Sequence, residues 1–256
     1  MLSLPIDIQA LIARFDDPAA KALVVLGSHT RGEAGPFSDV DLFRIFPVGD
    51  PHSGQNTTYL IDDHLVVVSD VDLNRVEQWF THPHLAVLTI GGLREGVALI
   101  DRENTFAAIK ARALDFTWDA EFQQRGDRWA AEQLVDCIEE VHKALNGLRR
   151  GDEGKLLAAR HSLSWTLLRI VHVHRGILPR SDRDVFDAAI RLVGEESPWT
   201  IALRGAFGIG QRSSLAEQLT AGLQLYVLTA EMIVRDPQHA SLIQQTVARI
   251  EAAVLQ

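Results

Sequence analysis

The sequence predicts an α+β chain, with a mixed β-sheet and flanking helices first and an α-helical bundle second. Two observations carry this prediction. Short β-branched runs alternate with turns before about residue 120, and after it apolar residues recur at helical spacing almost throughout. We therefore expect an N-terminal domain over residues 1–120 and a helical bundle domain over residues 121–256.

The first half is expected to contain short elements. A helix over residues 4–15 precedes a buried strand at 22–26, which Gly27 ends. Residues 27–38 hold too much glycine and proline for a long element. After these residues we expect strands at 39–46, 57–61 and 64–69 and a helix at 73–80. Apolar segments at 87–93 and 98–101 and a helix at 106–116 follow.

The second half is expected to be helical because its apolar residues form stripes three to five residues apart. Gly176 and Pro179 follow the second helix in the order that commonly ends one. The predicted helices are 128–148, 155–175, 182–193, 213–235 and 240–255. Such a set of helices is typical of a bundle.

Composition excludes several classes of protein. The 256 residues are 46% hydrophobic and 23% charged, which is an ordinary globular balance. A net charge of −9 is unfavourable for binding nucleic acid or an anionic membrane. No apolar run approaches the ~20 residues that span a bilayer. The first ten residues have no cationic region and carry Asp7, so they do not resemble a signal peptide. With Cys137 as the single cysteine, no intrachain disulfide forms, and we expect a cytoplasmic protein.

Two short motifs carry the chemistry. Asp39 and Asp41 are two residues apart in a predicted strand, so their carboxylates project from one face and repel each other unless a cation lies between them. Oxygen ligands favour Mg²⁺ or Mn²⁺. Gly27 and Ser28 follow the strand before, where free N–H groups and a hydroxyl are suited to holding phosphate. A phosphate site beside a metal site is what phosphoryl or nucleotidyl transfer requires.

These motifs resemble the signature of the polymerase-beta-type nucleotidyltransferase superfamily. The match covers residues 22–46, and the spacer between the motifs is similar to that of small bacterial members such as aminoglycoside and lincosamide nucleotidyltransferases. A looser resemblance extends to about residue 118. The resemblance implies a nucleotidyltransferase-like sheet, two divalent metals (Mg²⁺ or Mn²⁺), and transfer of a nucleoside monophosphate from an NTP to a hydroxyl.

The resemblance also assigns roles to residues. Gly27 and Ser28 match the phosphate-binding pair, and Asp39 and Asp41 match the metal ligands. Arg31 is placed to help hold the phosphates. A lysine of the helical domain often reaches the triphosphate in similar two-domain enzymes, and Lys143 is the candidate here. We expect the NTP and the metal to bind in a cleft between the two domains.

The sequence departs from the family pattern at the third acidic residue. The superfamily usually carries an Asp or Glu on a neighbouring strand, and the matching strand here reads Leu-Val-Val-Val. Val66 or Val67 occupies the acid position in the favoured register. Asp63 at the strand start is the candidate catalytic base if the strand is slipped, whereas Asp62 and Asp63 are also typical of a hairpin turn.

The sequence therefore predicts a metal-dependent, ATP-binding or other NTP-binding nucleotidyltransferase. Its acceptor is expected to be a small molecule such as an aminoglycoside-like compound, because an acidic chain suits a cationic acceptor better than nucleic acid. Two alternatives stay open: a nucleotide-binding regulatory protein that has lost activity, and a protein-modifying nucleotidyltransferase of toxin–antitoxin type. The preferred base and the oligomeric state are not readable from these patterns.

Overall fold

The computed structural model describes residues 2–210, 212–233 and 237–254, and it divides into two compact units. Unit 1 comprises Met1–Thr117 and Leu178–Asp182, and unit 2 comprises Trp118–Ile177 and Arg183–Gln256. Unit 1 holds a mixed sheet with helices, and unit 2 is helical. The α+β class predicted from the sequence is confirmed.

The sheet of unit 1 has five strands in the order β3-β4-β2-β1-β5. Strands β2 and β4 pair in parallel, and the other neighbours pair antiparallel. The two parallel strands place the start of β2 beside the start of β4, which positions the candidate site below. The bounds are β1 (Ala22–Leu26), β2 (Val40–Phe46), β3 (Asn56–Ile61), β4 (His64–Asp72) and β5 (Val97–Asp101).

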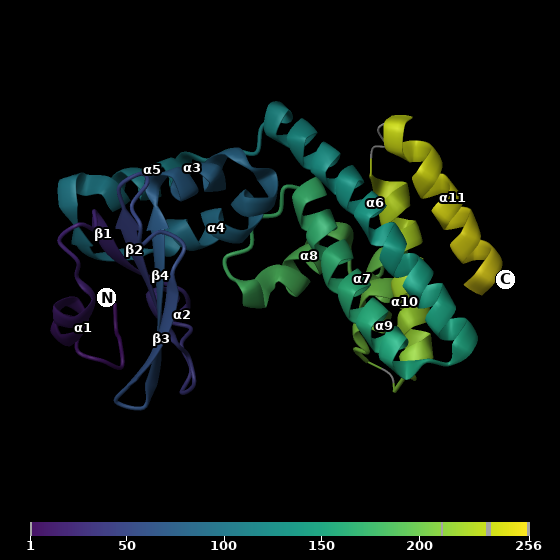
Figure 1. Cartoon of the computed structure of the whole chain (residues 1–256), viewed down its shortest axis with the longest axis horizontal. Coiled ribbons are helices and arrows are strands. Elements are labelled where there is room, and N and C mark those ends of the chain that lie inside the picture. Colours follow the sequence, from purple (N-terminus) through teal and green to yellow (C-terminus); the bar gives the residue numbers. More distant parts are fainter. Residues whose placement is uncertain (1, 211, 234–236, 255–256) are drawn as a thin grey trace. The chain divides into compact units, whose positions relative to one another are not determined.

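Helices cover both faces of this sheet. On one face, α1 packs on buried residues of the central strands, among them Leu23, Leu42 and Val66. On the other face, the ring of Trp79 on α3 meets that of Phe43 edge-on at 6.2 Å. Figure 1 shows α3, α4 and α5 grouped together, with α1 apart from them. The helices are α1 (Ile8–Phe15), α2 (Ser28–Arg31), α3 (Leu73–Thr81), α4 (Pro83–Glu95), the 3₁₀ helix η1 (Arg102–Asn104) and α5 (Thr105–Asp115).

Unit 2 contains α6 to α11, of which α9 was not predicted. Ser197 begins α9 by accepting a hydrogen bond from the Thr200 backbone, and Pro198 occupies its first turn. The predicted ends at residues 235 and 255 lie outside the described residues. The bounds are α6 (Ala120–Arg150), α7 (Glu153–His174), the 3₁₀ helix η2 (Asp182–Asp184), α8 (Val185–Val193), α9 (Pro198–Phe207), α10 (Leu215–Met232) and α11 (Pro237–Val254). None of the helices within the described ranges is long and apolar enough to cross a membrane.

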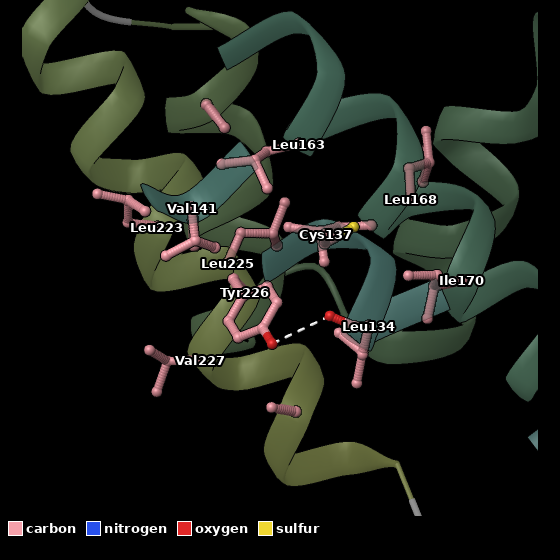
Figure 2. Packing of buried hydrophobic residues seen from close by; sticks show 14 of the residues in the cluster. Leu134, Cys137, Val141, Leu163, Leu168, Ile170, Leu223, Leu225, Tyr226 and Val227 are labelled. Atoms are coloured by element: carbon pink, nitrogen blue, oxygen red, sulfur yellow. Dashed lines mark hydrogen bonds between the residues drawn. The ribbon is translucent and has the colours of Figure 1, made fainter. Parts of the chain in front are cut away.

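The core of unit 2 gathers around the ring of Tyr226 on α10 (Figure 2). Its hydroxyl donates a hydrogen bond to the Leu134 carbonyl over 3.1 Å, so the one polar atom of this buried ring is satisfied. Cys137 on α6 lies in the same core. Burial raises the pKa of the Cys137 thiol to about 12, and the nearby carboxylates of Asp136 and Glu140 add to the rise.

Candidate active site

Strand β1 ends in a sharp turn at Gly27, whose φ is 80° and ψ is −156°. Glycine alone adopts this part of backbone space without strain. The turn starts α2, and the Thr30 hydroxyl donates a hydrogen bond to the Gly27 carbonyl over 2.9 Å. Ser28 is the first residue of α2 and is 6% exposed. The predicted phosphate pair thus lies where a strand gives way to the start of a helix.

Asp41 lies directly against this turn. In the ladder between β1 and β2, Asp41 is the partner of Leu26, the residue before the turn. A Cβ atom added at Gly27 would lie 2.4 Å from Oδ2 of Asp41, closer than real side chains approach. The absence of a side chain at Gly27 therefore lets the Asp41 carboxylate reach the turn. The structure brings these two predicted site residues together.

Asp39 follows a loop that is braced at its end. The Gly35 N–H donates to Ser38 Oγ over 2.9 Å, and the Ser38 N–H donates to the Gly35 carbonyl over 3.1 Å. Strand β2 begins at Val40, where its ladder with β4 starts. Asp39 consequently lies one residue before the strand, rather than inside it as the sequence predicted.

The oxygen donors at this turn suit a small divalent cation. Asp39 and Asp41 are two residues apart in extended chain, about 7 Å between Cα atoms. Mg²⁺ takes one or two carboxylates and completes its shell with water and phosphate oxygens. In the part of the chain that the structure describes, no group of three or more His, Cys, Asp or Glu gathers as a metal site. The carboxylate oxygens of Asp39 and Asp41 are of the type that Mg²⁺ and Mn²⁺ prefer.

The acid position on the neighbouring strand is occupied by valine. The parallel ladder pairs Val40 with Val66 and Asp41 with Val67. Asp63 lies in the hairpin turn between β3 and β4, where Asp62 and Asp63 both have positive φ, 48° and 62°. Four residues of strand separate Asp63 from Val67, about 13 Å along the chain. The structure does not bring Asp63 beside Asp41, so its assignment as the base gains no support from the register.

Two other acids of β4 have structural partners. The Asp70 carboxylate is 3% exposed and receives two hydrogen bonds of 2.7 Å from the Arg44 guanidinium. The Asp72 carboxylate accepts a hydrogen bond of 2.8 Å from the Arg75 backbone and caps α3. These partners account for both carboxylates without a role in the site.

Arg31 lies at the last position of α2. Its side chain is 3% exposed, and its Nε donates to Glu33 over 2.7 Å. Arg31 also lines a cavity of about 800 Å³ that the sequence analysis missed. Nε2 of His29, which lines the same cavity, is buried without a hydrogen-bond partner among the described residues. The N-terminal residues Leu2 to Pro5 form one wall of the cavity, and no local sequence pattern signals that packing.

Lys143 belongs to α6 of unit 2. Its ammonium group lies 2.8 Å from a Glu140 oxygen and 2.9 Å from a Glu139 oxygen. The hydrogen bond with Glu140, followed by that with Glu139, raises the pKa of Lys143 above its usual value. This lysine is therefore already paired with two carboxylates of its own helix, and its role as a phosphate ligand stays a prediction.

Comparison with known families bears on the turn and the two aspartates. Residues 6–94 match the nucleotidyltransferase domain family. The matched segment is about a third of the chain and contains Gly27, Ser28, Asp39 and Asp41. The resemblance drawn from these four residues is confirmed, and a nucleotidyltransferase domain is generally an enzyme that transfers a nucleotidyl group.

One similar solved structure is that of a nucleotidyltransferase-like protein from Exiguobacterium sibiricum. The two chains superpose with a TM-score of 0.53 at 15% sequence identity, over 94% of this chain and 78% of the other. At that identity the likeness shows a shared fold. No curated protein matches the chain.

Proposed function

We propose that unit 1 transfers a nucleoside monophosphate from an NTP to a hydroxyl of a small-molecule acceptor. The observation that carries the proposal is the contact between Gly27 and Asp41, because it joins a phosphate-binding turn to a carboxylate in one place. The family match over residues 6–94 supports nucleotidyl transfer.

Each residue of the site has a distinct task in this reaction. The Gly27 turn and Ser28 would hold the β- and γ-phosphates through backbone N–H groups and a hydroxyl. Asp39 and Asp41 would hold Mg²⁺ or Mn²⁺, which when bound neutralises charge on the triphosphate. The acceptor oxygen forms a bond to the α-phosphorus, the bond from that phosphorus to the bridging oxygen breaks, and pyrophosphate leaves. The hydroxyl proton is released to solvent or to a base outside β4.

A second candidate function rests on Val67. A valine beside Asp41 offers neither a metal ligand nor a base, which fits a protein that binds metal–NTP without transferring it. Transfer and binding are separated by measuring pyrophosphate release.

The test incubates the full chain with each of the four NTPs, Mg²⁺ and a panel of hydroxyl-bearing acceptors, and measures pyrophosphate. Acceptor-dependent release that is lost in Asp39→Asn and Asp41→Asn, and kept in Asp62→Asn, supports transfer. Asp62 is a suitable control because it lies exposed in the hairpin turn. NTP binding without pyrophosphate release from any acceptor would favour the second candidate.

A further inference from the structure

The sheet carries an apolar surface next to the two aspartates. Residues that are directly opposite in a ladder share a face of the sheet. Val67 is opposite Asp41, and Leu65, one step nearer to the strand start on the same face, is opposite Leu60 on β3. Leu65 is 42% exposed and Leu60 is 71% exposed. We call Leu60, Leu65 and Val67 the apolar strip.

The other face of the same hairpin is buried. Val66 and Val68 are in the core beneath α1, and Tyr59 packs against that core. On the face of the sheet that carries the strip, helix α3 covers the part farther along β2, where Trp79 contacts Phe43. The β3–β4 hairpin extends away from α3 and α4 (Figure 1). Leu60 and Leu65 are therefore exposed at one end of one face of the sheet, and Asp39 and Asp41 lie at the same end.

The position of the strip relates it to the acceptor. Neighbouring strands are about 4.8 Å apart, so Val67 is one strand from Asp41 and Leu60 is about 10 Å from the line of β2. If the hydroxyl of an acceptor approaches Asp41 across β4, the rest of the acceptor contacts these side chains. Asp41 and the turn residues Asp62 and Asp63 border the strip, but none of its three side chains carries charge. An apolar ring lying on the strip would release water from all three, whereas a charged group lying there would lose hydration.

The size of the strip limits what covers it. A stable protein interface buries about 800 Å² on each partner, far more than three side chains offer. A single ring or a short aliphatic chain matches three side chains spread over two strand spacings. A small molecule is thus a better occupant than a second polypeptide.

We propose that the acceptor is a small hydroxyl-bearing molecule whose apolar ring or chain lies on Leu60, Leu65 and Val67. The proposal rests on the proposed function and specifies its substrate class. It differs from the expectation of a polycationic, aminoglycoside-like acceptor, which depended on the net charge of the whole chain. In the transfer step the acceptor oxygen bonds to the α-phosphorus, and the bond from that phosphorus to the bridging oxygen breaks to release pyrophosphate. The hydroxyl proton passes to solvent or to a base outside β4, because Val67 cannot accept it.

The test is methyl NMR of the full chain labelled at leucine and valine methyl groups, in Mg²⁺ with a non-hydrolysable NTP analogue. Two probes are titrated: benzyl alcohol as an apolar ring with a hydroxyl, and kanamycin as a polycationic sugar. Benzyl alcohol should shift the methyl signals of Leu60, Leu65 and Val67 saturably, and kanamycin should leave them unchanged. Leu65→Ser should weaken benzyl alcohol binding about tenfold, as expected when one leucine contact is lost.

A matched control is Leu114→Ser on α5, where a leucine of unit 1 is 59% exposed. Loss of probe binding in this variant, or its persistence in Leu65→Ser, would overturn the proposal. So would kanamycin shifts at the strip, or shifts there that depend on protein concentration alone and therefore report a second copy. The benzyl alcohol titration is repeated without nucleotide, so a protein that fails to bind NTP loses the proposed function while the strip is still judged.

Discussion

Replacing Gly27 with alanine tests the central contact of the site. The backbone at Gly27 has φ of 80° and ψ of −156°, and a non-glycine residue held there costs about 1–3 kcal/mol of folding free energy. The added Cβ would also lie 2.4 Å from Oδ2 of Asp41. Because that oxygen is at the far end of a short side chain, we expect the Asp41 carboxylate to turn away and the pairing of the strands to persist. Gly27→Ala therefore loses stability through the backbone and loses function through Asp41.

The assay pairs urea unfolding with calorimetric titration of Mg²⁺–NTP. Loss of one charge-assisted ligand, about 1.5–3 kcal/mol, corresponds to at least a tenfold weaker metal–NTP affinity. Gly32→Ala is the control, because Gly32 also has a positive φ, 69°, but no atom lies within 4 Å of its added Cβ. This control should lose stability and keep binding. Equal Mg²⁺–NTP affinity in Gly27→Ala and Gly32→Ala would refute the role assigned to the contact.

Three further predictions concern the sheet and the buried thiol. Val67→Asp places a carboxylate opposite Asp41, so thermal unfolding should show lower stability without metal and a larger stabilisation by Mn²⁺ than in the parent chain. Asp70→Ala leaves the Arg44 guanidinium without its carboxylate, and urea unfolding should show a loss of about 3 kcal/mol, the low end for a buried pair because Arg44 keeps some solvent exposure. Cys137, with its pKa raised to about 12, should resist a thiol reagent at pH 8 until urea is added. Stability should also fall as pH rises above about 8.5, where the unfolded thiol ionises and the native thiol does not, and Cys137→Ala should remove that part of the fall. Full labelling of native Cys137 at pH 8, an unchanged response to Mn²⁺ in Val67→Asp, or an unaltered urea midpoint in Asp70→Ala would each contradict the corresponding argument.

Local patterns were sufficient for the parts of the site that depend on neighbours in sequence. The apolar run at 22–26, the glycine after it and the two aspartates were all readable, because strand, turn and metal ligand each have a short signature. The register was not readable: the sequence left Val66 and Val67 as alternatives, and only pairing across β2 and β4 shows that Val67 lies beside Asp41.

The remaining features of the site depend on packing between residues that are far apart in the sequence. The contact between Gly27 and Asp41 joins two strands, and the cavity beside α2 depends on where the N-terminal residues pack. The exposure of Leu60 and Leu65 is likewise a property of the folded sheet, since alternating apolar residues in a strand predict one buried face without saying where the covering helices end. Helix α9 was not predicted, although Ser197 and Pro198 carry a helix-start pattern.

The most direct test of the account is calorimetric titration of the full chain with each NTP, with and without Mg²⁺, for the parent chain and for Asp41→Asn and Asp62→Asn. The account predicts saturable binding that requires Mg²⁺, persists in Asp62→Asn and is lost in Asp41→Asn. Binding of equal affinity in Asp41→Asn, or no binding of any NTP to the parent chain, would contradict the assignment of Gly27, Ser28, Asp39 and Asp41 as a metal–nucleotide site.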